Sequence, residues 1–293
     1  PSGVVAISAS GSNRFSLLLE SNGSLQGMGL NLNGELGLGD ANQRLTPTHI
    51  ATSVISFAAG HDHALFVKGD GSLWAMGSNA YGQLGTGDNN DVNSPVLVVE
   101  ANVTSVAAGN GHSLFLKSDG SLWSMGRNDF GQLGDGNQTH RSVPAQIFAS
   151  EVMTIATGDH HSLFLRNDGS LWGMGRNHFG QLGLGDSTDR LYPTRAVTSN
   201  VTAVSAGQAH TLMLKTNALW GTGLNLDGQL GLGNLTNRTS FSSVASSGIG
   251  SLSGVITQGG TRPVITSHEG NATALVSVEE NSTTLTVASV TAY

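Results

Sequence analysis

The feature that most constrains the fold of this chain is a repeat of about 49 residues. One clear copy reads GHSLFLKSDGSLWSMGRNDFGQLGDG over residues 111–136. Two residue types mark the copies, a histidine (His63, His112, His161 and His210) and a tryptophan (Trp74, Trp123, Trp172 and Trp220). Periods of 20 to 50 residues are typical of solenoids and propellers. A catalytic site is assembled once in a chain, so we expect the recurring residues to belong to the scaffold.

Each copy contains two short apolar runs, such as SLFLK and SLWSMG, separated by an Asp-Gly or Asn-Gly pair. Runs of this kind around such a pair are typical of a β-hairpin, and a two-residue type I′ turn would need positive φ at both positions. Alternation along the strand sends Leu114 and Leu116 to one face and Phe115 to the other. Because both faces are apolar, the hairpins need cover on two sides. The pattern predicts an all-β fold of stacked blades.

Glycine is unusually abundant, with 41 residues in 293, roughly double the ordinary share of about 7%. Several glycines recur after the second strand, at Gly131, Gly134 and Gly136 in the copy quoted above. We expect them to adopt positive φ or to allow close backbone approach. This explanation needs no functional role.

The ordered series His, Asp-Gly, Leu-Trp, Gly, Asn and Gly-Gln-Leu-Gly resembles the repeat of the regulator-of-chromosome-condensation family. This resemblance implies a β-propeller with one four-stranded blade per repeat, usually seven blades in a ring. Five copies are recognisable here, from residue 4 to about residue 247. The first copy has Phe15 and Gln26 in place of the His and the Trp, and the fifth reads KTNALW without the Asp-Gly pair. In style the chain is most similar to the bacterial branch that inhibits β-lactamases.

The chain divides into propeller repeats over residues 1–247, a Gly/Ser-rich connector over 248–262 and a strand segment over 263–293. The last segment, with ALVSVEENSTTLTVASVTAY, resembles the opening strands of a bacterial cadherin-like domain. That resemblance implies a multidomain surface or secreted protein and makes Glu280 a candidate calcium ligand. The acidic pair that would complete the site is not in the sequence, so we expect no complete metal site.

The recurring histidines are predicted to be buried and bonded to the backbone in every blade. The alternative, a ring of metal-binding imidazoles around the axis, is interrupted by Phe15. The repeats contain no Gly-x-Ser-x-Gly elbow, the chain has no phosphate-binding loop, and it has no cysteine. We therefore predict no catalytic residue, no cofactor and no enzymatic activity.

Function is better sought where the copies differ. The position before Gly-Gln-Leu-Gly is aromatic in three successive copies, and neighbouring positions also vary. The predicted partner-binding residues are Tyr81, Phe130, Phe179, Asp129, His178, Asp62 and Asp159. Aromatic anchors within a polar rim are typical of protein interfaces. The alternative is that these aromatic side chains only cover the edges of the blades.

The formal net charge is −7, and no run of Lys or Arg interrupts it. A negative surface repels phosphate backbones, so nucleic acid is disfavoured as a partner, and no apolar run is long enough to span a bilayer. We predict a non-catalytic protein-binding module, extracellular or on a bacterial cell surface, that uses loops on one propeller face. The alternative is a structural subunit of an extracellular fibre that self-associates through residues 263–293.

Overall fold

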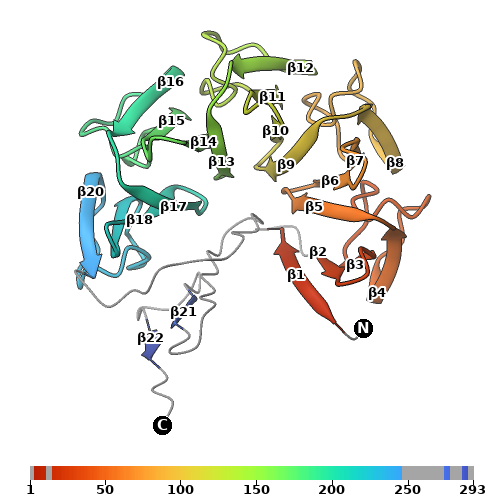
Figure 1. Ribbon diagram of the computed structural model, residues 1–293, viewed down its shortest axis with the longest axis horizontal. Helices are drawn as coiled ribbons and strands as arrows, with labels where there is room; N and C mark the ends of the chain where they lie inside the picture. Colours follow the sequence, from red (N-terminus) through yellow and green to blue (C-terminus); the bar gives the residue numbers. More distant parts are fainter. Residues whose placement is uncertain (1–2, 11–14, 246–273, 278–285, 290–293) are drawn as a thin grey trace.

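The computed structural model describes residues 3–10, 15–245, 274–277 and 286–289 of the chain. These residues form strands, turns and loops, with no helix among them. Twenty strands make five four-stranded antiparallel sheets, which stand as an arc of blades around a common axis (Figure 1). The predicted all-β propeller of about 49-residue blades is confirmed.

Each blade has its strands in chain order, with the first strand innermost. The first blade comprises β1 (Val4–Ala9), β2 (Phe15–Glu20), β3 (Leu25–Gly29) and β4 (Arg44–Ala51). The second comprises β5 (Val54–Ala59), β6 (His63–Lys68), β7 (Leu73–Gly77) and β8 (Val92–Val99). The third comprises β9 (Val103–Ala108), β10 (His112–Lys117), β11 (Leu122–Gly126) and β12 (Arg141–Phe148). The fourth comprises β13 (Val152–Thr157), β14 (His161–Arg166), β15 (Leu171–Gly175) and β16 (Arg190–Val197). The fifth comprises β17 (Val201–Ala206), β18 (His210–Lys215), β19 (Ala218–Gly223) and β20 (Arg238–Ala245).

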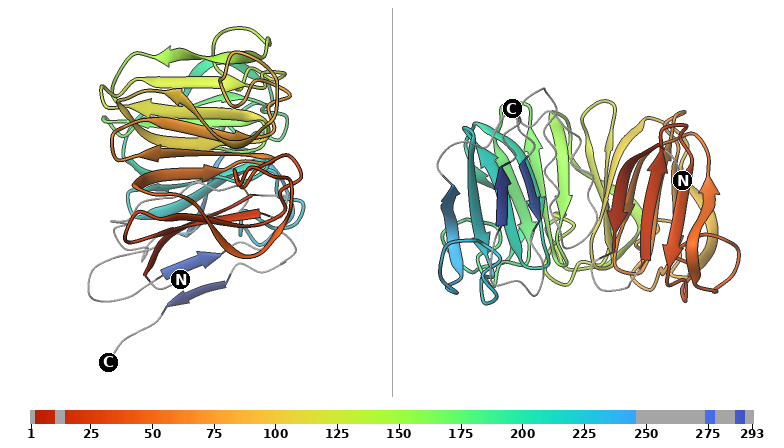
Figure 2. Two further views of the ribbon diagram at one scale, coloured as in Figure 1. Left: turned by 90° about the vertical axis from the view of Figure 1, so that its right-hand side faces the viewer. Right: turned by 90° about the horizontal axis from the view of Figure 1, so that it is seen from below.

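The strands run along the propeller axis, so the connections gather at its two ends (Figure 2). The short turns between the second and third strands lie at one end, which we call the turn face. The other end, the loop face, carries the connections at 60–62, 109–111, 158–160 and 207–209 and the long loops at 78–91, 127–140, 176–189 and 224–237. All of the predicted partner-binding residues lie in loop-face connections.

The turns between the second and third strands differ from the expected type I′. In the second blade, the amide of Gly71 donates to the carbonyl of Lys68, and φ is positive at Gly71 but not at Asp70. This is a three-residue loop in which only the glycine needs the left-handed conformation. The fifth blade lacks the Asp-Gly pair, yet both residues of its two-residue turn, Thr216 and Asn217, have positive φ.

The core lies between the blades. Leu65 and Leu73 on the forward face of the second blade pack in one cluster with Val106 and Phe115 on the rear face of the third, and Trp123 packs against this cluster, half-buried. The indole Nε1 of Trp123 donates to Ser121 Oγ at 2.9 Å. The same arrangement of apolar faces recurs between the other neighbouring blades.

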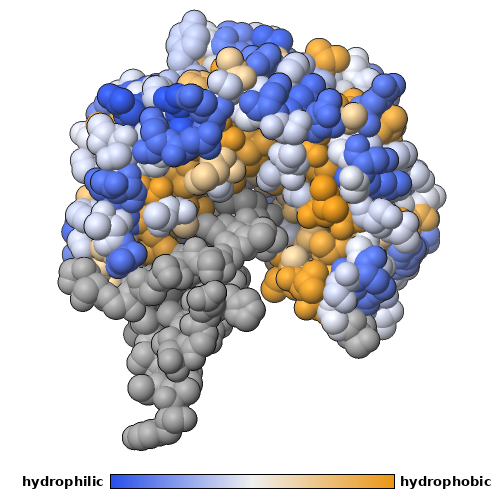
Figure 3. All heavy atoms as spheres, in the orientation of Figure 1, coloured by the Kyte–Doolittle hydropathy of each residue, from blue (hydrophilic) through white to orange (hydrophobic). Residues whose placement is uncertain are grey.

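The rear face of the first blade is more exposed than the rear faces of the other blades within the described residues. Ile7 is 60% exposed, whereas its counterparts Phe57 and Val106 are 3% and 4% exposed. Val4 is 42% exposed, although Val103 at the same repeat position is 1% exposed. Apolar surface is accordingly visible at the β1 end of the arc (Figure 3).

The recurring histidines are buried. In His63, His112 and His161 the ring atom Nε2 bonds a side chain of the next blade and not the backbone, and the buried Nδ1 has no hydrogen-bond partner among the described residues. His63 Nε2 lies 2.9 Å from Ser113 Oγ of the next blade, and Ser113 Oγ donates to the carbonyl of Gln83 at 2.8 Å. Since the hydroxyl has one proton, His63 must donate through Nε2–H. The same bridge joins His112 to Ser162 at 3.0 Å.

The hydrogen-bond bridge requires a histidine in one blade and a hydroxyl in the next. His161 forms the same bridge to Thr211 Oγ1 at 3.2 Å. The interface between the first and second blades has Phe15 and Ala64 at the two positions, so it has neither the imidazole nor the hydroxyl. At the end of the series, the buried Nε2 of His210 has no hydrogen-bond partner in the described part of the chain. Burial lowers the pKa of His63 to about 4 and of His161 to about 3, so both rings are neutral at neutral pH.

Two further strands, β21 (Ala274–Ser277) and β22 (Thr286–Ser289), pair with each other as an antiparallel two-stranded sheet. The predicted connector over residues 248–262 and the candidate calcium ligand Glu280 lie outside the described residues. The boundaries at residues 247 and 262 stay predictions.

Candidate binding site on the loop face

The inner loops of the loop face are joined from blade to blade by backbone hydrogen bonds. The amide of His61 donates to the carbonyl of Gly109 at 3.2 Å, and the amide of Asn110 donates to the carbonyl of Asp159 at 3.1 Å. The amide of Asp159 then donates to the carbonyl of Gln208 at 3.1 Å. Because neighbouring blades hold each other's loops, the side chains on this face are presented by a pre-organised backbone.

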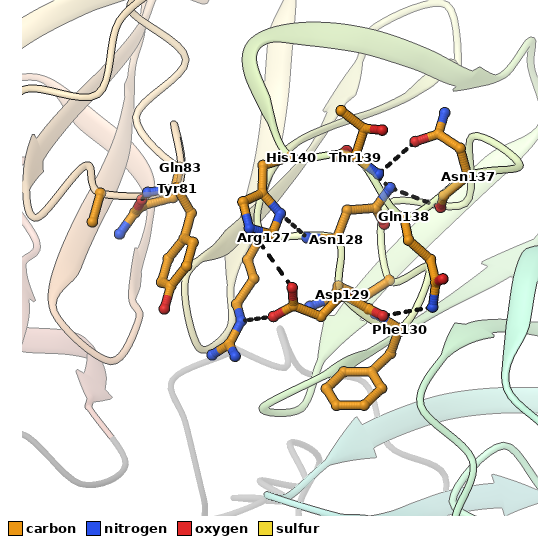
Figure 4. A network of polar contacts seen from close by, with 12 residues as sticks. Tyr81, Gln83, Arg127, Asn128, Asp129, Phe130, Asn137, Gln138, Thr139 and His140 are labelled. Atoms are coloured by element: carbon orange, nitrogen blue, oxygen red, sulfur yellow. Dashed lines mark hydrogen bonds and ion pairs between the residues drawn. The ribbon is translucent and has the colours of Figure 1, made fainter.

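The long loops are held from within by their recurring Asn and Gln. The buried amide of Asn128 donates to the carbonyls of Asn137 and Thr139, and its oxygen accepts from the amide of Leu133 at 3.0 Å (Figure 4). The amide of Phe130 donates to Gln132 Oε1 at 3.0 Å. These bonds explain why Asn and Gln recur in the copies, and they fix the backbone that carries each aromatic residue.

Tyr81 projects from the second blade and packs against residues of the third. The guanidinium carbon of Arg127 lies 4.8 Å from its ring centroid, and His140 approaches its edge, with ring centroids 5.1 Å apart (Figure 4). A Cβ atom at Gly111 would lie 2.9 Å from Tyr81 Cδ2, and φ there is +80°, so this position requires glycine. The phenol is half-buried.

Phe130 is one copy further on and packs in the same way against the fourth blade. The guanidinium carbon of Arg176 lies 5.0 Å from its ring centroid, and the imidazoles of His160 and His178 lie at 5.2 and 5.8 Å. Arg176 also lies 5.7 Å from the ring of Phe179. One arginine therefore bridges two of the three aromatic side chains.

The three predicted aromatic residues do not touch one another among the described residues. The site is instead a row in which aromatic rings alternate with arginines. A guanidinium held over a ring gains cation–π attraction of about 0.5 to 1 kcal/mol at exposed sites. The rings also cover the blade edges, so the two interpretations made from the sequence are compatible.

The aspartate and the histidine beside each arginine occupy opposite positions in the third and fourth copies. In the third copy, Asp129 accepts a hydrogen bond from Arg127 Nε at 2.5 Å and lies 3.7 Å from His140 Nε2. In the fourth copy, His178 stands at the position of Asp129, and Asp189 at the position of His140. The imidazole and carboxylate are again close, at 3.4 Å between His178 Nε2 and Asp189 Oδ2.

The two acidic residues predicted in the inner loops have different surroundings. Asp62 is paired with His61, with Oδ2 2.8 Å from Nδ1, and this hydrogen bond raises the pKa of the imidazole. Asp159 joins neighbouring loops through its backbone. Next to it, burial lowers the pKa of His160 to about 4, and the charges of Arg127 and Arg176 lower it further. His160 is neutral at neutral pH, beside two permanent cations.

No group of three or more His, Asp or Glu side chains that could hold a metal ion occurs among the described residues. In that same part of the chain, no helix has the length and apolar character needed to cross a membrane. The loop face instead offers guanidinium, imidazole, carboxylate and aromatic groups on a fixed backbone. This chemistry suits recognition.

Sequence reasoning missed Arg127, Arg176 and His140. The two arginines stand between the recurring Gly and Asn of the repeat, at 126–128 and 175–177. A usable signal was present, because this position is Leu30, Ser78 and Leu224 in the other three copies. The position varies, and it is cationic only next to an aromatic residue of the preceding blade.

The RCC1-like domain model matches residues 1–260 of the sequence. The chain belongs to this family. Human WBSCR16 is a similar solved structure, with a TM-score of 0.76 and 24% identity, covering 88% of this chain and 70% of that one. Prp20p from Saccharomyces cerevisiae has a TM-score of 0.71 and 26% identity, covering 83% and 63%.

Yeast RCC1 (Prp20), solved with Kap60, has a TM-score of 0.71 and 23% identity, covering 80% of this RCC1-like chain and 60% of its own. The chain thus spans less than two thirds of either yeast structure. No curated protein matches the sequence.

Proposed function

We propose that this RCC1-like chain is a non-catalytic protein-binding module that receives its partner on the loop face. The observation that carries this proposal is the row of Tyr81, Arg127, Phe130, Arg176 and Phe179 on loops that neighbouring blades hold together. Tyr and Arg dominate the binding energy of protein interfaces when a rigid backbone presents them. The paired groups around them, including Asp129, His178 and the His61–Asp62 pair, form a polar rim.

Two properties support a protein partner. The family resemblance is to proteins that bind others: Prp20p was characterised for its binding to Gsp1p and histones, and yeast RCC1 was solved bound to Kap60. The net charge of −7 disfavours a nucleic-acid backbone. An extracellular or cell-surface location, in a bacterial protein with a cadherin-like extension, is part of this proposal and rests on the sequence resemblance.

The proposal is tested by a variant in which Tyr81, Phe130 and Phe179 are all replaced by Ala. We expect it to remain folded, with a modest decrease in melting temperature because the rings are half-buried, and to lose the proteins that the unchanged chain captures from its native source. The matched control replaces Ile55 and Met153 by Ala, since these exposed side chains, 56% and 52% accessible, are on inner strands outside the loop face. Equal capture by the triple variant would contradict the proposal.

A second function, a subunit of an extracellular fibre, is favoured by one observation. The rear face of the first blade exposes Val4 and Ile7, which correspond to interface positions in the other blades. Apolar surface of this kind can be covered by another molecule. If the contact is head-to-tail and does not close, a filament forms.

A further inference from the structure

The two arginines of the loop face, Arg127 and Arg176, differ in whether a carboxylate of their own loop pairs with them. Arg127 has a carboxylate partner in its own loop, since Asp129 Oδ2 lies 2.5 Å from its Nε. Arg176 occupies the equivalent position one blade later, but its Nε donates to His178 Nδ1 at 3.2 Å. Among the described residues Arg176 forms no ion pair with a carboxylate.

The opposite positions of the aspartate and the histidine in the third and fourth copies explain this difference. In the fourth copy the carboxylate belongs to Asp189, which accepts a hydrogen bond from the amide of Asn177 at 2.7 Å and faces His178 Nε2. With Nδ1 accepting from Arg176, the imidazole of His178 carries a hydrogen on Nε2, which lies 3.4 Å from Asp189 Oδ2. The carboxylate therefore lies on the far side of the imidazole from Arg176, and no carboxylate of its own loop pairs with the guanidinium.

The groups around Arg176 favour the binding of an anionic group. Its guanidinium lies over the ring of Phe130 at 5.0 Å and near the ring of Phe179 at 5.7 Å, which limits its freedom while leaving it partly accessible. The neighbouring His160 is neutral and packs on the ring of Phe130 at 5.2 Å, and its buried Nδ1 has no hydrogen-bond partner among the residues that the structure describes. No acidic group among the described residues pairs with this cation, so its guanidinium is available to a carboxylate of a bound protein.

We propose that the guanidinium of Arg176 is the docking point for a carboxylate side chain, Asp or Glu, of the protein that binds the loop face. This inference rests on the proposed function and specifies the chemistry of the partner at one position. A planar guanidinium binds a carboxylate through two parallel hydrogen bonds. A ring beneath it keeps the cation in place and excludes water from one side.

Arginines at the start of the fourth strands provide the contrast. Arg44 and Arg190 are paired with Asp40 and Asp186 at 2.7 and 2.6 Å. Arg238 has no carboxylate, but its guanidinium donates to the carbonyl of Thr236 in its own loop, and no cation–π contact involves it within the described residues. It is a matched control for unpaired positive charge without aromatic support.

The test uses the full chain at about physiological salt and two labelled peptides, Gly-Leu-Glu-Leu-Gly and Gly-Leu-Gln-Leu-Gly, capped at both ends so that the Glu is the only charge. We expect the Glu peptide to shift the side-chain Nε–H resonance of Arg176 in NMR titrations and to bind at least fivefold more tightly than the Gln peptide. Arg176→Gln should abolish this preference, and Arg238→Gln should leave it unchanged.

Two substitutions test the mechanism without removing an arginine. His178→Asp restores the arrangement of the third copy, so Arg176 gains its own carboxylate, and the preference for Glu should fall. Asp129→Asn releases Arg127, so the preference should rise and a second resonance should move. Equal binding of the two peptides by the unchanged chain, or an unchanged preference in Arg176→Gln, overturns the inference. Loss of partner capture in the aromatic triple variant would still support the proposed function in that case.

Discussion

His63 and Ser113 belong to neighbouring blades, and a hydrogen bond of 2.9 Å joins the imidazole of one to the hydroxyl of the other. The hydroxyl in turn donates a hydrogen bond to the carbonyl of Gln83, in the blade that carries the histidine. Every blade interface with a histidine and a hydroxyl has this bridge, and the interface with Phe15 and Ala64 has neither group. The two positions therefore act as one unit.

The first prediction follows from this coupling. Ser113→Ala leaves the Nε2–H of His63 and the carbonyl of Gln83 buried without partners, so we expect a loss of about 1 to 3 kcal/mol in the free energy of unfolding. Adding His63→Phe reproduces the first interface, and the double variant should lose at least about 0.5 kcal/mol less than the sum of the two single changes. Urea unfolding measures both quantities. Strict additivity would show that the pair is not coupled.

The second prediction concerns acid stability. Burial lowers the pKa of His63 and His210 to about 4 and of His161 to about 3, against 6.5 when unfolded. Below pH 6.5 the unfolded chain binds more protons than the folded one, so stability is full above pH 6.5 and is lost as the pH falls toward 4. The loss is roughly 2 kcal/mol per buried histidine between pH 6.5 and 5.

Urea midpoints at pH 7.5 and pH 5.0 provide the measurement. His61 has a raised pKa, so its contribution is present below pH 6.5 and lost above it, in the opposite direction. It is one partly exposed group against several buried ones, and the net effect should be destabilisation at pH 5.0. His161→Gln should reduce the difference between the two midpoints. An equal or higher midpoint at pH 5.0 would contradict the assignment of neutral buried rings.

The third prediction concerns the recurring tryptophan. Trp123 packs against the cluster between the second and third blades but stays half-buried, so Trp123→Ala should cost about 3 kcal/mol, the lower end of the range for large aromatic side chains. Trp123→Phe keeps most of the packing and loses only the bond to Ser121, and should cost less. A change within about 0.5 kcal/mol for the alanine variant would show that the ring does not stabilise the core.

The fourth prediction separates the two candidate functions. If the first blade's rear face binds another copy, the full chain should assemble with increasing concentration in sedimentation experiments, and Ile7→Asp should prevent it. A version that ends at Thr261 tests the contribution of the C-terminal strands in the same way. Monomers throughout the concentration range would exclude the fibre subunit.

The fold could be predicted from the sequence because the same repeat specifies the strands and turns within a blade and the apolar faces that pack between blades. Strand pairs, apolar faces and the positive φ of Gly131, Gly134 and Gly136, at 80, 76 and 86°, all follow from patterns that recur in every copy. The turn type could not be predicted from the Asp-Gly pair alone, because a two-residue and a three-residue loop use the same residues and differ only in register.

The location of the site could be predicted from the sequence, but not all of the residues that form it. Variable positions before Gly-Gln-Leu-Gly pointed to the loop face, since function concentrates where repeats differ. The role of Arg127 and Arg176 depends on contacts across a blade boundary, between residues 46 positions apart in the pairs Tyr81–Arg127 and Phe130–Arg176. Neither hydropathy nor spacing within one copy reports such a contact.

The central claim is that the loop face is the surface that binds a protein. Hydrogen exchange of the full chain, alone and with its captured partner, tests this most directly. We predict slower exchange in the loops at 78–91, 127–140 and 176–189, with the turns at 69–72, 118–121 and 167–170 unchanged. Slower exchange confined to those turns, with the loop face unchanged, would contradict the account.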